Sequence, residues 1–200
     1  LSVHETKSVN KPETLEWLRS KKANVAISFG CRSIIRKPFL ENFGWLVMNC
    51  HSTDLPRNRG GATLSWLVLN EEDTIYGTIH LIDEGIDSGD VLIKISEPLR
   101  CPDPYPIDYM RECHEMSLRA CGLLLDTIEQ GKTLPRESMN LEEGTYFPRL
   151  MTEENAAIDW SWRSEDIVRF ARAFGRPYTG AFSFARDKRI HIGSAEVLPT

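Results

Sequence analysis

The sequence predicts an α/β fold of the Rossmann-like kind: a largely parallel sheet with flanking helices, followed by the start of a small C-terminal segment. Short apolar runs alternate along the chain with segments of helical length, which is the order expected of an α/β protein. The first of these apolar runs, Val25 to Phe29, has the pattern of a parallel strand that is covered on both faces. With 41% hydrophobic and 26% charged residues, the chain has the composition of a globular domain with its own core.

Two helix and strand pairs are expected in the first quarter of the chain. Pro12 to Lys21 is predicted to be a short helix, because a proline suits the first turn, acids come early and bases come late. Val25 to Phe29 is an apolar run that a glycine stops, which is typical of a buried strand. Pro38 to Phe43 is expected to form another short helix that ends at a glycine. Trp45 to Asn49 is then the second strand.

The next segment continues the alternation. Gly61 to Leu69 is predicted to be an apolar helix, Tyr76 to Ile82 a third strand and Val91 to Ile95 a fourth. Tyr109 to Glu129 has the spacing of a long amphipathic helix, and a glycine follows it. Open parallel sheets bind ligands at the carboxyl ends of their strands, so the polar residues after the second and third strands become candidates for a site.

The character of the sequence changes after Pro135. Residues 1–135 are expected to form the main domain, 136–161 a polar connector, and 162–200 a small C-terminal segment. In that last segment Ser164 is predicted to cap a helix that runs to about Phe174. The alternating runs expected to pair as a hairpin are Phe182–Phe184 and Ile190–Ile192.

Composition excludes several classes of protein. Five cysteines make an odd number with no CxxC pair, which argues against a disulfide framework and against a zinc site. No run of eighteen apolar residues is present, so we expect a cytoplasmic protein with no membrane partner. A net charge of -5 gives no broad electrostatic surface for nucleic acid, although a local basic patch or a basic part outside this chain would change that. The oligomeric state is left open.

Asn49 and His51 lie two residues apart at the end of the second predicted strand. If the extended geometry persists, their side chains point to the same side, which places an amide donor and a titratable base in one pocket. For an arbitrary Asn-x-His sequence, a turn asparagine and a structural histidine are the commoner interpretation. The pair therefore depends on its surroundings for any functional meaning.

Two polar loops supply those surroundings. Ser52 to Ala62 leads directly into a predicted helix start, which can bind an anion through free backbone N–H groups, and Arg57 and Arg59 would add positive charge there. The second loop, Asp83 to Asp90, follows the third strand and carries four carboxylates around two glycines. That strand is interpreted as parallel to the second, so the loop should emerge at the same edge as Asn49 and His51, where a carboxylate can orient an imidazole or a water.

These motifs resemble a known family. Asn49 to Ser52, Leu55 to Gly60 and Gly85 to Leu92 are similar in type and spacing to the signatures of the 10-formyltetrahydrofolate-dependent formyltransferases, which include sugar-nucleotide N-formyltransferases and methionyl-tRNA formyltransferase. The resemblance covers about Asn24 to Gly131. Further matching segments follow at Tyr146–Arg149, Ile158–Trp160 and Arg172–Ala181.

The resemblance implies an enzyme of one-carbon metabolism, a transferase in which an amine attacks the formyl carbon of a folate donor. Asn49 would donate a hydrogen bond to the developing oxyanion, an effect of roughly 3 kcal/mol when one such donor is removed. His51 would move the proton and, when charged, help to stabilise the oxyanion. Asp87 would orient His51 or a relay water and raise the basicity of the imidazole. No metal is implied.

The resemblance also implies where the 10-formyltetrahydrofolate binds. The pterin ring would lie against the segment Phe29 to Ile35 and the loop that begins at Asp83, where backbone amides and carbonyls would recognise its edge. Without the resemblance, core packing is the preferred interpretation of the two isoleucines. The expected cofactor-binding residues are Arg32, Ser33, Ile34, Ile35, Asp83 and Gly85.

The acceptor amine stays open among several alternatives. An amino sugar linked to a nucleotide is placed first, because the acidic balance disfavours tRNA and the C-terminal motifs look closer to those of the sugar-nucleotide enzymes. Methionyl-tRNA is the second alternative. Small amine metabolites are the third. A formyltetrahydrofolate hydrolase that uses water, and a folate-binding or assembly module without turnover, are alternatives to a transferase.

Two departures from the family pattern stand out. Members of the family carry a glycine-containing first strand and helix before the region seen here, so residues 1–135 are expected to be a formyltransferase catalytic domain that lacks its N-terminal part. The chain is also expected to be truncated at its C-terminal end. Cys50 and Thr53-Asp54 vary the common loop sequence, which bears on acceptor specificity more than on catalysis.

Overall fold

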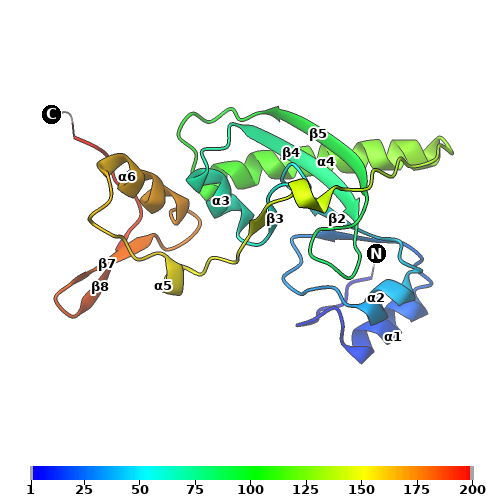
Figure 1. Ribbon diagram of the computed structural model, residues 1–200. Helices are drawn as coiled ribbons and strands as arrows, with labels where there is room; N and C mark the ends of the chain where they lie inside the picture. Colours follow the sequence, from blue (N-terminus) through cyan, green and yellow to red (C-terminus); the bar gives the residue numbers. More distant parts are fainter. Residues whose placement is uncertain (1, 199–200) are drawn as a thin grey trace. The chain divides into compact units, whose positions relative to one another are not determined.

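A computed structural model of the protein describes residues 2–198, which divide into two compact units (Figure 1). The first unit contains the described residues up to Arg59 together with Tyr76–Ile95 and Ser117–Thr145. The second contains Gly60–Ile75, Ser96–Met116 and the described residues from Tyr146 onward. Within residues 2–198, no helix is both long and apolar enough to cross a membrane.

A four-stranded sheet in the order β1-β2-β4-β5 organises the first unit. β1 and β2 are parallel, with Ala26 opposite Val47, whereas β2 and β4 are antiparallel, with Asn49 opposite His80. The α/β class with flanking helices is therefore confirmed, and the sheet is mixed rather than parallel throughout. The strands are β1 (Ala26–Phe29), β2 (Val47–His51), β4 (Thr74–Leu81) and β5 (Val91–Pro98).

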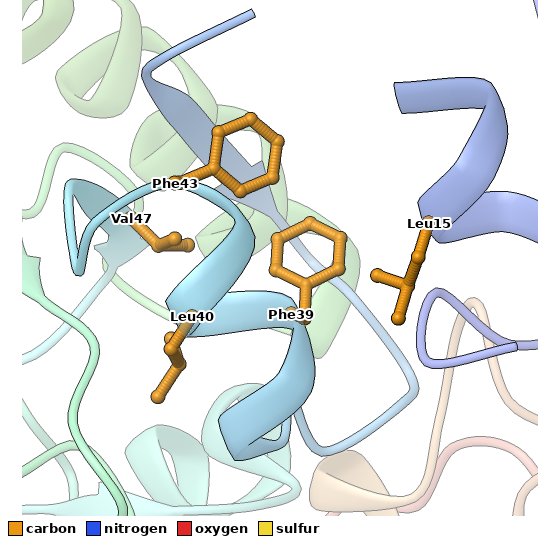
Figure 2. Close-up of a cluster of buried hydrophobic side chains, with 5 residues drawn as sticks. All are labelled: Leu15, Phe39, Leu40, Phe43 and Val47. Carbon is orange, nitrogen blue, oxygen red and sulfur yellow. The ribbon is translucent and has the colours of Figure 1, made fainter. Parts of the chain in front are cut away.

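One face of β2 packs against the two short N-terminal helices, α1 (Pro12–Ser20) and α2 (Lys37–Asn42). Figure 2 shows the buried cluster that joins them, in which two phenylalanine rings of the α2 region lie 5.0 Å apart between their centroids. Both helices carry proline in their first turn, where the missing N–H breaks no helical hydrogen bond. The cluster consists of Leu15, Phe39, Leu40, Phe43 and Val47.

The opposite face of β2 is covered by α4 (Pro106–Glu129), whose second half belongs to the first unit. Met48 of β2 packs there with residues of β4, β5 and α4. Because side chains alternate along a strand, residues 47, 49 and 51 lie on the side of Val47, and residues 48 and 50 lie on the side of α4. The members of this second cluster are Met48, Ile79, Leu92, Ala120 and Leu124.

The second unit combines helical and hairpin elements. The ring of Trp66 stacks on Phe147 at 5.3 Å and donates a hydrogen bond to the carbonyl of Pro148, so α3 is tied to the segment that contains β6. Arg169 of α6 donates hydrogen bonds to Glu71 and Asp166. The remaining elements of the chain are β3 (Arg59–Gly60), α3 (Thr63–Leu69), η1 (Leu141–Glu143, in the first unit), β6 (Tyr146–Phe147), α5 (Thr152–Asn155), α6 (Ser164–Ala173), β7 (Ala181–Ala185) and β8 (Lys188–Ile192).

Every helix and strand named from the sequence is present, and most boundaries move by one to three residues. The predicted role of Ser164 is wrong. Arg163 occupies the N-cap of α6, Ser164 is the first helical residue, and no side chain caps the helix. The C-terminal hairpin is confirmed, with Phe182 of β7 opposite His191 of β8.

The interpretation of the third predicted strand as parallel is also wrong, because β4 runs antiparallel to β2. The carboxyl end of β4 therefore lies beside the start of β2, where Ile82 N donates a hydrogen bond to Val47 O. The loop after β4 cannot reach the end of β2 by sharing a strand edge with it. It reaches His51 only because it folds back over the sheet.

Candidate active site

Asn49 and His51 lie on β2, on the face that also carries Val47. Cys50, which stands between them, faces α4, and its Sγ lies 3.6 Å from Sγ of Cys121. Burial raises the pKa of the Cys50 thiol above its ordinary value, and the neighbouring Cys121 raises it further. Cys50 is therefore a packing residue, and the strand presents only the carboxamide and the imidazole to the site.

His51 is nearly buried, with a side chain that is 9% exposed. Its Nε2 lies 3.2 Å from the carbonyl oxygen of Asn58, so Nε2–H is the donor in that contact. Its Nδ1 faces the Asp87 carboxylate at 3.8 Å, a distance that leaves room for tightening or for a relayed proton. A protonated ring would have an acceptor at each nitrogen.

Four influences act on the pKa of His51. Burial lowers it and is the largest effect, since the charged ring loses its hydration. The Asp87 carboxylate raises it, His80 lowers it and the Asn58 carbonyl raises it, and the net result lies below the ordinary value. The unliganded site therefore favours a neutral imidazole that has a lone pair available to take a proton.

The loop after β4 brings Asp87 to the site. Oδ1 of Asp83 accepts hydrogen bonds from Gly85 N at 2.9 Å and from Ser88 Oγ at 2.7 Å, which closes the turn on itself. A Cβ at position 85 would collide with Ser88 Oγ, so any other residue there would displace the hydroxyl that binds Asp83. Asp87 itself has a positive φ of 48°, a conformation that aspartate tolerates better than most residues. The loop thus fixes a carboxylate beside the histidine.

His80 is the site residue that the sequence did not identify. It is 1% exposed on β4, directly opposite Asn49 in the strand register. Its Nε2 lies 3.3 Å from Nδ2 of Asn49 and 3.5 Å from Oδ1 of Asp87. The three predicted residues are thus brought together, but Asn49 is linked to Asp87 through His80. Only knowledge of the β2–β4 register would have revealed this.

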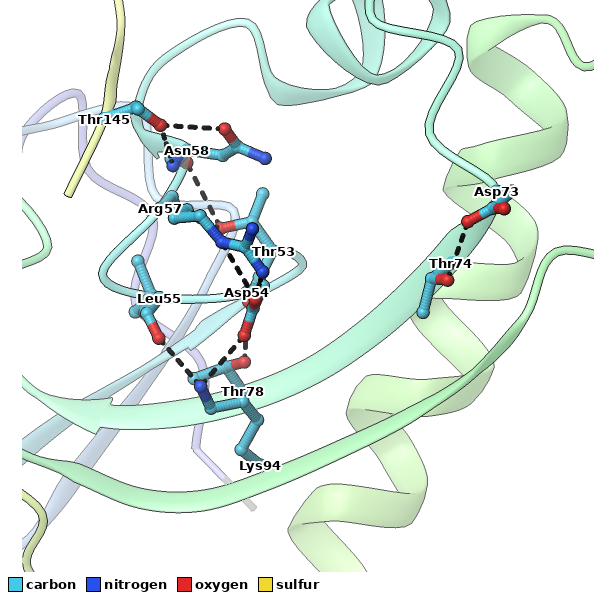
Figure 3. Close-up of polar contacts among 10 residues, drawn as sticks. All are labelled: Thr53, Asp54, Leu55, Arg57, Asn58, Asp73, Thr74, Thr78, Lys94 and Thr145. Carbon is cyan, nitrogen blue, oxygen red and sulfur yellow. Dashed lines mark hydrogen bonds and ion pairs between the residues drawn. The ribbon is translucent and has the colours of Figure 1, made fainter. Parts of the chain in front are cut away.

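The loop after β2 is held by a set of polar contacts (Figure 3). Thr78 Oγ1 donates to the carbonyl of Thr53 at 2.7 Å, and Thr53 Oγ1 donates in turn to the carbonyls of Arg57 and Asn58. Lys94 Nζ donates to the carbonyl of Leu55 at 2.8 Å. These contacts fix the Asn58 carbonyl that receives the hydrogen bond from His51.

The two arginines of this loop have different environments. Arg57 is an ion-pair partner of Asp54, which also binds Lys94 Nζ at 2.9 Å. Burial alone would raise the pKa of the Asp54 carboxyl, but the hydrogen bonds from Arg57 and Lys94 hold it below its ordinary value. Arg59, by contrast, has a buried Nε with no hydrogen-bond partner among residues 2–198. Arg59 is therefore the better of the two candidates for binding a ligand anion.

The residues expected at the folate lie in two segments that meet at one core cluster. Ile35 and Ile82 both pack against the Leu15–Val47 cluster of Figure 2. Asn10 fixes the first segment, since its side chain donates to the carbonyl of Ile34 and accepts from Arg36 N. The side chain of Ile34 is nevertheless 59% exposed. An apolar side chain held on a fixed backbone suits a flat heterocycle.

The other expected folate residues have less specific environments. Arg32 is exposed, and the carbonyl of Ser33 accepts a weak hydrogen bond from Cys31. Asp83 and Gly85 form a hydrogen bond with each other within their own loop, as described above. Within residues 2–198, no three His, Cys, Asp or Glu side chains converge in a way that would hold a metal ion.

The fold and the cluster define an α/β protein in which a carboxamide, two imidazoles and a carboxylate meet on one face of the sheet. Residues 3–104 match the profile described as formyl transferase, and residues 150–200 match that of the formyl transferase C-terminal domain. The chain belongs to the formyl transferase family. The resemblance inferred from the sequence motifs is confirmed.

Curated relatives include methionyl-tRNA formyltransferases. The chain is 32% identical over 184 residues to methionyl-tRNA formyltransferase of Geotalea uraniireducens, and the match covers 92% of this chain and 58% of that protein. The chain thus spans little more than half the length of such curated relatives.

Solved structures share the fold. A sugar N-formyltransferase from Shewanella sp FDAARGOS_354 matches with a TM-score of 0.74 at 18% identity, over 96% of this chain and 77% of that one. An N-formyltransferase from Helicobacter canadensis, in complex with folinic acid and dTDP-3-aminofucose, matches with a TM-score of 0.59 at 24% identity, over 73% and 54%.

Proposed function

We propose that the protein transfers a formyl group from 10-formyltetrahydrofolate to the amine of a nucleotide-linked amino sugar. The observation that carries this proposal is the cluster of Asn49, His51 and Asp87 on one face of the sheet, joined by His80. The donor supplies a formyl carbon, which passes from the folate nitrogen to the acceptor nitrogen. Membership of the formyl transferase family supports formyl as the group that is transferred.

Each side chain has a chemical role in this proposal. Asn49 donates an N–H to the formyl oxygen as negative charge develops on it. His51 starts neutral, because burial lowers its pKa, and takes the proton that the attacking amine releases. Asp87 stabilises the resulting imidazolium, and the proton then passes to the folate nitrogen as the bond from that nitrogen to the formyl carbon breaks. His51 is neutral again after a turnover, so the net charge of the enzyme is unchanged.

The folate would bind beside the Leu15–Val47 cluster, where Ile35 follows the exposed Ile34 and Ile82 precedes the loop from Asp83 to Asp87. Ile34 would contact the flat ring, and the backbone of the two segments would recognise its edge. Arg59 would bind a phosphate of the acceptor, because its buried Nε has no protein partner among the described residues. A net charge of -5 supports an acceptor with few phosphates.

Methionyl-tRNA is the second candidate acceptor. It is favoured by the 32% identity to the Geotalea enzyme, whose name states that substrate. The net negative charge argues against it, because a tRNA needs many cationic contacts. The two candidates share the chemistry of the site and differ only in what is bound beyond the reacting amine.

Product analysis by mass spectrometry tests the proposal. The purified protein is incubated with 10-formyltetrahydrofolate and, in separate reactions, nucleotide-linked amino sugars, initiator methionyl-tRNA or no acceptor. We expect one formyl group on an amino sugar. Formylated methionyl-tRNA alone would establish the second candidate, and formate release without an acceptor would establish a hydrolase. No product in any reaction would contradict an enzymatic role.

A further inference from the structure

His80 has hydrogen-bond contacts that determine which of its nitrogens carries the proton. Its Nδ1 lies 2.7 Å from the carbonyl oxygen of Leu81. A carbonyl only accepts, so Nδ1 must be protonated. In the neutral ring Nε2 then has a lone pair, and its nearer neighbour is Nδ2 of Asn49 at 3.3 Å, whereas Oδ1 of Asp87 lies farther away at 3.5 Å. The carboxamide nitrogen is therefore the donor in the contact between these two residues.

This contact defines the orientation of the Asn49 carboxamide. A carboxamide can rotate by half a turn and exchange its oxygen for its nitrogen with little change in shape. The reversed orientation would place the Asn49 oxygen against the lone pair of His80, with no hydrogen between two acceptors. The observed orientation uses one N–H of Asn49 on His80 and leaves the second N–H for a ligand oxygen.

We propose that His80 is a positioning residue, which acts through Asn49 by holding its carboxamide with the nitrogen directed to the reaction. This rests on the proposed formyl transfer, in which Asn49 serves the developing oxyanion. The donor must already be in place when charge develops, because reorienting it during the reaction would consume the stabilisation that it provides. The 1% exposure of His80 keeps water from competing for Nε2.

The proposal predicts different outcomes for three substitutions of His80. Glutamine places its side-chain oxygen near the position of Nε2, so His80→Gln keeps an acceptor for Asn49. Asparagine places its nitrogen near the position of Nδ1, so His80→Asn keeps only the contact with Leu81. His80→Leu keeps neither. We expect kcat to fall by about 10- to 100-fold in the leucine and asparagine variants, with little change in the KM for the folate, and to recover in the glutamine variant.

Double-mutant cycles identify the residue through which His80 acts. In an Asn49→Ala background, His80→Leu should have almost no further effect on kcat, because there is no carboxamide left to orient. In an Asp87→Asn background, the effect of His80→Leu should persist. The reverse pattern would show that His80 acts through Asp87, and it would overturn the proposal. His114→Leu on the exposed side of α4 is the matched control, and thermal unfolding monitors the fold of every variant.

A spectroscopic measurement separates this proposal from the proposed function. Nitrogen-15 NMR of the imidazole rings distinguishes the two neutral tautomers and the charged ring without any substrate. We expect His80 to be neutral with its proton on Nδ1 in the wild-type protein. A proton on Nε2, in either the neutral or the charged ring, would overturn the role of His80 even in an active enzyme. If His80 has the expected tautomer but no acceptor is formylated, the proposed function fails and the orientation of Asn49 still stands.

Discussion

At the scale of single residues, the site combines a buried base with a carboxylate that stands slightly too far away to hydrogen-bond it. The 3.8 Å between His51 Nδ1 and Asp87 Oδ2 is longer than a hydrogen bond before a substrate binds. Burial meanwhile keeps the imidazole neutral. The geometry thus suits a group that must be a free base at the start of the reaction and a stabilised cation later.

Replacing Asp87 with asparagine tests the carboxylate alone. Asparagine has almost the same shape and also tolerates the positive φ of this position, so the loop should keep its conformation. We expect kcat to fall by about 10²- to 10⁴-fold, because the charge that supports protonated His51 is lost. Steady-state kinetics and a folate-binding titration measure the two effects separately. Turnover near the wild-type value would exclude Asp87 from the reaction.

The lowered pKa of His51 predicts a pH dependence of stability. The ordinary value of 6.5 applies to the unfolded chain, and the folded value lies below it. Between these two values the unfolded state binds the proton and the folded state does not. The contribution of neutral His51 to the free energy of unfolding should therefore be fully present above about pH 6.5. It should decrease as the pH falls towards the folded pKa.

Denaturant unfolding at several pH values from 8 to 5 measures this effect, compared with His51→Gln, which cannot titrate. The difference between the two proteins isolates His51 from other groups that bind protons in the same range. We expect the wild type to lose more stability than the variant as the pH falls. Equal losses in both proteins would show that His51 does not carry the effect.

At the scale of elements, the limits of the sequence are clearest in β4. Its apolar run identified a strand, but a run of apolar residues carries no information about the direction of its neighbour. The prediction that Asp87 meets His51 was based on a parallel β4 and a shared sheet edge. In the structure Asp87 does lie beside His51, but β4 is antiparallel to β2 and the loop after it folds back.

The same limit explains why His80 was not recognised. Asn49 and His51 were identifiable because strand alternation relates neighbours in one element. His80 lies opposite Asn49 through a register between two elements, which no local pattern encodes. The helices and strands were predictable from turn residues and apolar spacing. The contacts that give the site its geometry depended on tertiary pairing.

Thr78 of β4 offers a test of the loop that supports His51. Its hydroxyl is buried and donates to the carbonyl of Thr53, so Thr78→Val leaves that carbonyl without its partner while keeping the shape and the strand preference. We expect the free energy of unfolding to fall by about 1–3 kcal/mol. We also expect kcat to fall, because Thr53 holds the Asn58 carbonyl that binds His51.

Thr74 on the same strand provides the matched control. Its hydroxyl donates to Asp73 in an exposed contact, also drawn in Figure 3. Thr74→Val should change the stability by less than about 0.5 kcal/mol and leave kcat unchanged. Chemical denaturation and steady-state kinetics on both variants give the comparison. Equal effects would mean that the buried contact of Thr78 does not support the loop.

At the scale of the whole molecule, charge should determine how the acceptor is bound. Arg59 has a buried Nε without a protein partner among residues 2–198, whereas Arg57 pairs with Asp54. We expect Arg59→Ala to raise the KM for the acceptor by about 10- to 100-fold, the range of one charged hydrogen bond, with less change in the KM for the folate. Arg57→Ala is the comparison and should raise the KM for the acceptor by less than Arg59→Ala does. Equal changes for both substrates would remove Arg59 from the acceptor site.

Salt dependence should distinguish the two acceptor classes. A nucleotide-linked sugar carries only two or so phosphates, and a protein with a net charge of -5 needs only one or two cationic contacts to bind it. A tRNA requires many phosphate contacts, and each contact releases counterions. Its apparent affinity would fall by roughly a thousandfold or more between 50 and 200 mM salt. We therefore expect kcat/KM for the acceptor to change only slightly over this range, measured at fixed pH with saturating folate. A steep decline with methionyl-tRNA, together with no reaction on sugar nucleotides, would show instead that the acceptor is the tRNA.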